Sequence, residues 1–278
     1  MTISSFRHTF NEKKQKNLSK NYIPAWGKNQ VDLNQFHWRK QKESLFAVYL
    51  PCAGEKPYYQ SQSHKYFKMK MWDFLPKPWH KLIQICTISE VLGIIPENIE
   101  DKIFIEKRNI FWYEHYPQAN EGDISRTKEW LRNFVMKYSF NYNFAYLTSK
   151  TFIQIANLPE LKIFPANIEH KNPVLEYRRT SNIQQLFEAI KSEYINLLSS
   201  RYIVWKKKRS RLAYILELFF DSSSLTFKDL RKSFRKSNCL NIMLPALSTE
   251  RGCISGGIYL QKEGDTYKLI ENLRNLLG

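Results

Sequence analysis

The chain has 278 residues, of which 43% are hydrophobic and 15% aromatic, so the composition excludes a disordered protein. Lys and Arg number 43 against 26 Asp and Glu, and the net charge of +17 indicates a polyanionic partner. The sequence contains no apolar run near the ~20 residues of a bilayer span and no signal-peptide core at its start, so we expect a cytoplasmic protein without a membrane partner.

Cysteine spacing argues against a structural metal site. No C-x-x-C pair and no zinc-finger spacing to a histidine occurs among the four cysteines, which are Cys52, Cys86, Cys239 and Cys253. We therefore expect free thiols, no bound metal and no cofactor.

Three regions are predicted along the chain. Residues 1–43 are a basic N-terminal extension, partly ordered by aromatic residues such as Trp38. Residues 44–180 are predicted to form an α/β domain with a mostly parallel sheet and flanking helices. Its expected strands are the apolar runs at 45–50, 82–88, 102–105, 143–148 and 152–155.

Helices are expected between and after these strands. Residues 61–72 can be helical with Ser61 or Ser63 as N-cap, and 125–139 carry an apolar helical stripe with Ser125 as N-cap. The strongest helical pattern lies at 181–200, where Ser181 and Gln184 resemble a capping box.

Residues 181–278 are predicted to form a helical and winged-helix-like nucleic-acid-binding domain. Helices are expected at 209–220 and at 225–236, the latter capped by Thr226. A further helix at 240–252 is broken or started by Pro245, and 257–270 read as a hairpin with a Glu-Gly-Asp turn. Three helices followed by a hairpin is the order of a winged helix.

The stretch "PCAGEKPYYQSQSHK" (51–65) carries the most chemistry. It follows the first predicted strand, and ligands bind beyond the carboxyl ends of such strands. The helix that begins near Ser61 offers free N–H groups to a developing anion. Cys52 and Lys56 are the candidate nucleophiles, and His64 is a candidate proton donor. An ordinary reading, a solvated lysine and a buried small cysteine, stays open from the residues alone.

This stretch resembles the P-C-x-x-x-K-P-Y-x-x-S-x-S-H motif of the archaeosine synthase core-domain family. The matching positions are Cys52, Lys56, Pro57, Tyr58, Ser61, Ser63 and His64. A second stretch, "TISEVLGIIPENIED" (87–101), is similar to a strand-and-loop of the same family. The resemblance makes Pro57, Ser89, Gly93 and Pro96 candidate substrate-binding residues.

The resemblance implies chemistry on the nitrile of 7-cyano-7-deazaguanine (preQ0) within a nucleic acid, with the motif lysine adding to the nitrile carbon. Three departures are visible: Tyr59 replaces a serine, a family stretch expected after Tyr116-Pro117 is missing, and the transglycosylase-like portion and RNA-binding tail are absent. They favour the smaller DpdC-like relatives, which convert the nitrile in DNA to the amide. Hydroxyls of Tyr58, Ser61 or Ser63 would stabilise the charge on nitrogen.

Two other functions remain open at this point. One is a tRNA modification enzyme that adds an amine to the same nitrile. The other is a non-catalytic winged-helix DNA-binding protein. The expected partner is nucleic acid, with DNA favoured over tRNA, and other proteins of a DNA-modification system are possible partners.

A basic segment marks the expected nucleic-acid contact. The sequence "WKKKRSR" (205–211) supplies Lys206, Lys207, Lys208, Arg209 and Arg211 for phosphate contacts. The alternative is a solvated helix face. Candidate aromatics for stacking on a flipped base are Trp72, Trp79, Trp112 and Tyr113.

Overall fold

The computed structural model describes residues 31–106, 121–168, 172–222, 224–233, 239–248, 258–270 and 273. The predictions for residues 1–30, for Trp112 and Tyr113, and for Tyr116-Pro117 lie outside these residues. No helix in the described ranges combines the length and the apolar character that crossing a bilayer requires.

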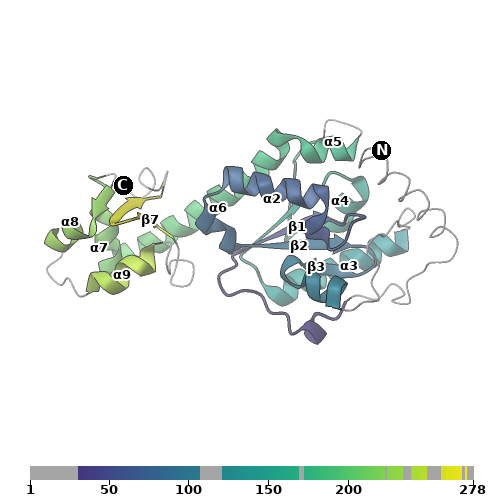
Figure 1. Ribbon diagram of the computed structural model, residues 1–278, viewed down its shortest axis with the longest axis horizontal. Coiled ribbons are helices and arrows are strands. Elements are labelled where there is room, and N and C mark those ends of the chain that lie inside the picture. The colour runs from purple at the N-terminus through teal and green to yellow at the C-terminus, as the bar shows by residue number, and fades with distance from the viewer. Residues whose placement is uncertain are drawn as a thin grey trace, which may run out of the picture.

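A five-stranded sheet forms the centre of the larger part of the molecule (Figure 1). Its strands are β1 (Phe46–Pro51), β2 (Ile83–Ser89), β3 (Gly93–Pro96), β4 (Tyr142–Tyr146) and β5 (Lys162–Phe164). They lie in the order β3-β2-β1-β4-β5, and only β3 runs antiparallel to its neighbour. The predicted mostly parallel sheet is therefore confirmed.

Helices cover both faces of this sheet because its central strand is apolar on both sides. Phe46, Val48 and Leu50 of β1 belong to one core cluster, whereas Ala47 and Tyr49 belong to the other. The first cluster includes residues of α2 (Gln62–Phe74) and α6 (Thr180–Lys207), and the second includes residues of α3 (Glu121–Tyr138) and α4 (Lys150–Ala156). Figure 1 shows α2 and α3 on opposite sides of the sheet.

Several local predictions are wrong. The expected strand at 102–105 is a π-helical turn (Lys102–Glu106), because exposed Asp101 and Lys102 precede buried Ile103 and Phe104 and no alternation exists. The expected strand at 152–155 lies within α4, and β3 was not expected.

Two predicted helix caps are also wrong, because both helices begin earlier than expected. Ser125 lies inside α3, which starts at Glu121. Ser181 lies inside α6, whose N-cap is Arg179.

The residues just before β1 join the core. Trp38 is 6% exposed, stacks on Phe134 of α3 with ring centroids 5.7 Å apart, and donates its indole N–H to Asn98 at 2.8 Å. This aromatic residue therefore orders the end of the N-terminal extension, as its sequence suggested.

The C-terminal unit, residues 211–269, has the element order of a winged helix. Its elements are α7 (Arg211–Glu217), β6 (Ser224–Thr226), α8 (Phe227–Ser233), α9 (Leu240–Leu247), β7 (Leu260–Glu263) and β8 (Thr266–Leu269). The strands form an antiparallel sheet in the order β6-β8-β7, and Gly264, with φ 58°, lies in the hairpin turn. Thr226 caps α8, since its Oγ1 accepts the Asp229 N–H at 3.2 Å, whereas Pro245 lies inside α9.

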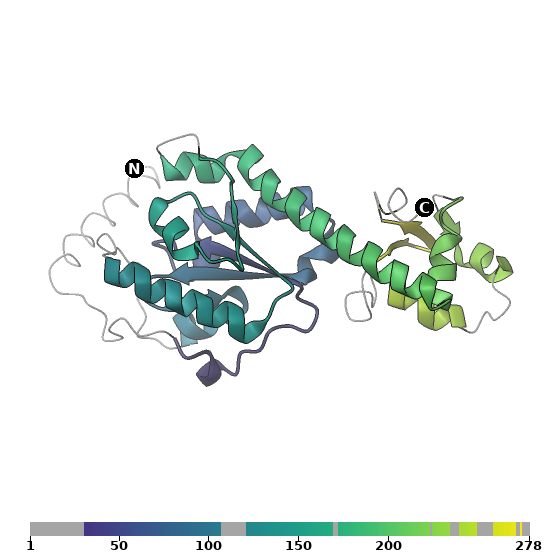
Figure 2. The same ribbon diagram turned by 180° about the vertical axis from the view of Figure 1, so that it is seen from behind.

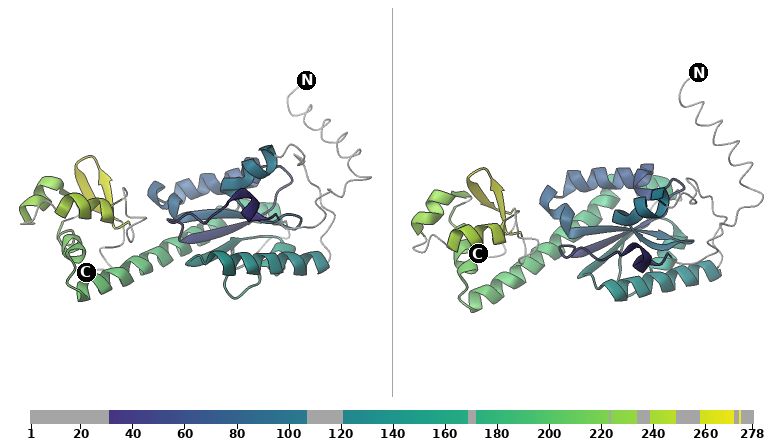
Figure 3. Two further views of the ribbon diagram at one scale, coloured as in Figure 1. Left: turned by 90° about the horizontal axis from the view of Figure 1, so that it is seen from below. Right: turned by 60° about the horizontal axis from the view of Figure 1, so that its bottom comes forward.

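Helix α6 links the two parts. It packs on the sheet through its first half and extends away to carry the C-terminal unit (Figures 2 and 3). Contacts at its far half include Tyr194 Oη accepting the Ile258 N–H at 2.7 Å and Tyr259 Oη donating to the Leu198 carbonyl at 2.9 Å.

Candidate active site

The lysine loop, residues 52–61, connects β1 to α2 at the carboxyl end of the central strand. After β1, the chain adds β2 and β3 on one side of β1 and then returns to add β4 and β5 on the other side. The order in which strands are added therefore reverses between β1 and β4. Open α/β sheets bind ligands at such a reversal, outside the carboxyl ends of the strands. The loop therefore occupies the position at which this class of sheet carries its site.

Ser61 begins α2. Its Oγ accepts the His64 N–H at 3.3 Å, and the Ser63 hydroxyl lies 3.3 Å from the Ser61 hydroxyl. The predicted N-cap is confirmed, and two of the motif's hydroxyls meet at the positive end of the helix.

His64 lies in the first turn of α2 and is 2% exposed. Its Nε2 is 3.0 Å from the Pro51 carbonyl oxygen, which only accepts, so Nε2 donates. Burial and the charge of Lys68 lower the pKa of His64 to about 4, although the Pro51 bond opposes this. A neutral imidazole whose N–H is already bonded joins β1 to α2 and is poorly suited to deliver a proton near neutral pH.

Lys56 and Tyr58 are buried inside the loop, at 3% and 0% exposure. The Lys56 Nζ lies 5.7 Å from the centroid of the Tyr58 ring. The same ring lies 6.1 Å from the His64 ring and 5.3 Å from the Phe104 ring. The structure thus brings the predicted amine, phenol and imidazole together around Tyr58, with Pro57 also buried.

Cys52 lies at the start of the loop, is partly exposed and forms no disulfide within the described residues. Its N–H donates to the Ile88 carbonyl of β2 at 3.0 Å, which prolongs the β1–β2 pairing by one residue. The backbone at Cys52 is therefore fixed, and its side chain packs against the second core cluster.

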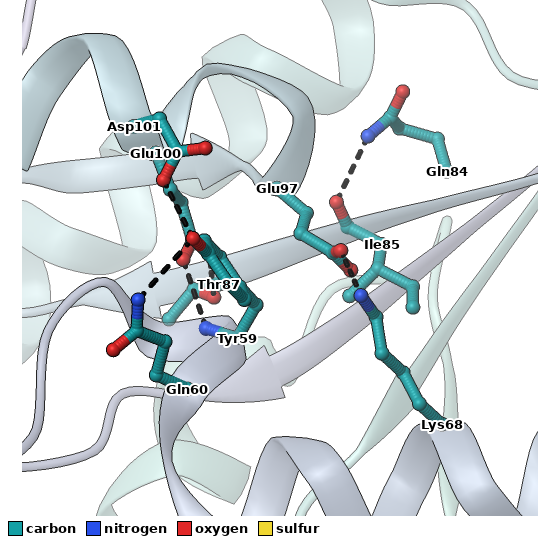
Figure 4. Close-up of polar contacts among 9 residues, drawn as sticks. All are labelled: Tyr59, Gln60, Lys68, Gln84, Ile85, Thr87, Glu97, Glu100 and Asp101. Carbon is teal, nitrogen blue, oxygen red and sulfur yellow. Dashed lines mark hydrogen bonds and ion pairs between the residues drawn. The ribbon is translucent and has the colours of Figure 1, made fainter.

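Glu100 is the site residue that sequence reasoning missed. It follows the short turn Glu97–Ile99 after β3 and is 0% exposed. Its Oε2 accepts the Tyr59 N–H at 2.9 Å, and its Oε1 lies 3.4 Å from the Thr87 hydroxyl of β2 (Figure 4). Burial, with a smaller effect of Glu97, raises the pKa of Glu100 to about 8, against the Tyr59 bond. At neutral pH this carboxyl therefore holds a proton beside the loop.

The second family-like stretch forms the β2–β3 turn. The Ser89 hydroxyl oxygen accepts the Leu92 N–H at 3.1 Å, and Gly93 has φ 84°, which favours glycine. Pro96 is buried at the end of β3. These contacts account for the turn, so the assignment of Ser89, Gly93 and Pro96 to substrate binding stays a prediction.

The predicted cations lie far from the loop. Lys206, Lys207, Lys208, Arg209 and Arg211, here called the basic segment, are exposed at the end of α6 and the start of α7. With 28 residues at 1.5 Å each, α6 is roughly 40 Å long, and its first turn is near the carboxyl end of the sheet. The structure therefore separates the basic segment from the lysine loop (Figure 3).

The candidate stacking aromatics differ in exposure. Trp79 is 3% exposed and packs on Tyr194, so its predicted role in stacking is wrong. Trp72 is 68% exposed on α2 and stacks beside His80. Within the described residues, no group of three or more His, Cys, Asp or Glu side chains could hold a metal ion.

Fold and site define a domain with a mostly parallel sheet and a lysine-bearing loop at its carboxyl edge. Residues 32–162, just under half of the chain, match a family described as a domain of unknown function (DUF5591). A solved structure described as AF0587, a protein of unknown function, is 20% identical, with a TM-score of 0.36. That match covers 53% of this chain and 44% of the other. No curated protein matches the chain.

Proposed function

We propose that the protein converts the nitrile of 7-cyano-7-deazaguanine in DNA to the amide, with Lys56 as the nucleophile. The observation that carries this proposal is a buried lysine at the carboxyl end of the central strand, surrounded by the other residues of the motif. The matching domain, DUF5591, is found in proteins like archaeosine synthase and DpdC.

The chemistry needs a nucleophile and a proton. Attack of the Lys56 amine on the nitrile carbon forms a C–N bond and places negative charge on the nitrile nitrogen. That nitrogen takes a proton, water then adds to the same carbon, and the amine leaves, so the net change is addition of one water to the nitrile.

Glu100 is the better candidate for this proton than His64. Its pKa of about 8 keeps the carboxyl protonated near neutral pH, whereas the pKa of His64, about 4, leaves the imidazole neutral. The N–H groups at the start of α2, with the Ser61 and Ser63 hydroxyls, can stabilise the charge on nitrogen.

DNA is the proposed polyanion, and the basic segment its electrostatic anchor. About 40 Å separates this segment from the carboxyl edge, which corresponds to about 12 base pairs at 3.4 Å each. A short oligonucleotide cannot reach both places, so a test substrate needs at least ~20 base pairs on either side of the modified base.

The test is nucleoside mass spectrometry after incubation with duplex DNA that contains the nitrile base. Wild-type protein should produce the amide, and Lys56→Ala should lose at least 10³-fold in rate, because it removes the group that forms the covalent bond. Lys65→Ala is the matched control, since Lys65 is an exposed lysine on α2 nine residues away.

Three results separate the alternatives. Full conversion by Lys56→Ala excludes Lys56 as the nucleophile, and loss of conversion in Cys52→Ala alone assigns the role to Cys52. An amine-bearing product in nitrile-containing tRNA supports the tRNA reaction. DNA binding without any product from either nucleic acid leaves the non-catalytic reading.

A further inference from the structure

Tyr59 contacts neighbouring side chains through its backbone N–H, its hydroxyl and its ring (Figure 4). Its backbone N–H donates to Glu100 Oε2 at 2.9 Å, and its phenol donates to Asp101 Oδ1 at 2.8 Å. The Lys68 ammonium lies 5.6 Å from the centroid of its ring. The Tyr59 hydroxyl also accepts from Gln60 Nε2 at 3.3 Å, so the backbone, the ring and the hydroxyl of one loop residue are all held by side chains.

The residues that hold Tyr59 are themselves anchored to the fold. Glu100 also contacts the Thr87 hydroxyl on β2, and Lys68 of α2 pairs with Glu97. Glu97, Glu100 and Asp101 lie on the turn that follows β3. The contacts therefore tie the middle of the lysine loop to β2, to α2 and to this turn.

A displacement at Tyr59 would pass directly to Lys56. Tyr58, the preceding residue, packs its ring near both the Lys56 Nζ and the His64 ring. The loop's other end is fixed where Ser61 caps α2 and the Ser61 N–H donates to the Tyr58 carbonyl at 2.9 Å. Between these fixed points, Tyr59 is the residue whose side chain reaches out of the loop to a separate element.

We propose that Asp101 is a positioning residue that acts through Tyr59 as a latch, holding the lysine loop so that Lys56 meets its substrate in the reactive orientation. This inference rests on the proposed function of Lys56. Asp101 does not need to touch the substrate, because its effect passes through Tyr59 and the backbone of the loop. Misplacement of a reacting group by about 1 Å can cost about 100-fold in rate.

The latch differs from a contact that only stabilises the fold. Asp101 is exposed and Tyr59 partly exposed, so losing their bond leaves both groups able to bond water. Tyr59→Phe and Asp101→Ala should therefore fold with nearly unchanged melting temperature. Their effect should be confined to the loop and to turnover.

The experiment measures two quantities in Tyr59→Phe, Asp101→Ala and the double variant. One is hydrogen exchange of the Tyr59, Gln60 and Ser61 amides, which needs no substrate. The other is the separation of kcat from KM on nitrile-containing DNA. The matched control is Tyr202→Phe, which removes a phenol–carboxylate bond of 3.1 Å to Glu217 at the α6–α7 junction, away from the loop.

The latch predicts at least tenfold faster exchange at these amides and a 10- to 100-fold lower kcat with unchanged KM. The single variants and the double variant should show similar effects, because both substitutions break the bond between the Tyr59 phenol and Asp101. Unchanged exchange and kcat overturn the latch, as does an additive double variant. If wild-type protein converts no nitrile, the proposed function fails, and the exchange data alone then support or overturn the latch.

Discussion

Ionisable side chains are buried in and around the lysine loop, whereas those of the basic segment are exposed. In and around the loop, Lys56, His64 and Glu100 are nearly or fully buried and contact other protein groups. In the basic segment, Lys207, Lys208 and Arg209 lie in solvent. The net charge of +17 thus combines buried ionisable groups that contact protein with exposed ones that face solvent, and the buried Glu100 and His64 couple protonation to folding.

This difference determines which solution variable acts on which region. A buried group resists ionisation, so pH changes the free energy of unfolding through the loop region. An exposed cation acts at a distance that salt screens. We therefore expect pH to act on the loop region and salt on the basic segment.

Glu100 should give the largest effect of pH on stability. Its pKa is raised from 4.5 to about 8 in the folded protein, so the folded state binds a proton that the unfolded state releases between these values. The stabilisation is present below pH 4.5 and is lost as pH rises to about 8, by at most about 5 kcal/mol. Glu100→Gln keeps an acceptor for the Tyr59 N–H and cannot ionise, so it should remove this loss.

The measurement is urea unfolding at several pH values between 5 and 8. Glu97→Gln is the control, since Glu97 lies on the same turn but is partly exposed and paired with Lys68. Parallel pH profiles for wild type and Glu100→Gln would contradict a buried, protonated carboxyl.

His64 should give a smaller effect of opposite sign. Its pKa is lowered from 6.5 to about 4, so the folded state excludes a proton that the unfolded state takes up. The stabilisation is complete above pH 6.5 and decreases as pH falls to about 4, by about 3 kcal/mol. Because the Glu100 and His64 effects have opposite signs and similar slopes, they should cancel between about pH 4.5 and pH 6.5, and wild-type stability should fall on either side of this range.

The test compares His64→Gln, which retains a donor for the Pro51 carbonyl, with His80→Gln. His80 bonds the Leu75 carbonyl at 3.1 Å in a more open position. His64→Gln should remove the compensation of Glu100, so that the free energy of unfolding falls continuously from about pH 4.5 to pH 8. If wild type and His64→Gln change equally over this range, the folded protein does not exclude a proton from the imidazole.

The strand and the helix cap that flank the lysine loop could be predicted from local sequence patterns. The role of Glu100 could not, because it depends on tertiary contacts. β1 and the Ser61 cap could be predicted because an apolar run and a capping serine are features of a few adjacent residues. Glu100 could not, because its role depends on contacts with Tyr59 and Thr87, which lie 41 and 13 residues away. The strand expected at 152–155 failed because four apolar-rich residues fit a strand or a buried helix equally well.

The basic segment should give the smallest effect, and one that salt abolishes. Lys207→Glu/Lys208→Glu removes two cations that can contact phosphate, so affinity for duplex DNA should fall about 10- to 100-fold at low salt. The slope of log affinity against log salt should become shallower by about 2. Fluorescence anisotropy between 50 and 200 mM salt measures both quantities.

The matched control is Lys65→Glu/Lys77→Glu, which changes the net charge equally on exposed residues of the α/β part. If location matters, only the first variant loses affinity, while the unfolding free energy of both stays near that of wild type, because exposed charges contribute little to folding. Equal losses in the two variants would mean that net charge alone attracts DNA. The basic segment would then be a solvated helix end without a specific role in DNA binding. It would differ from the lysine loop only in that its side chains are exposed.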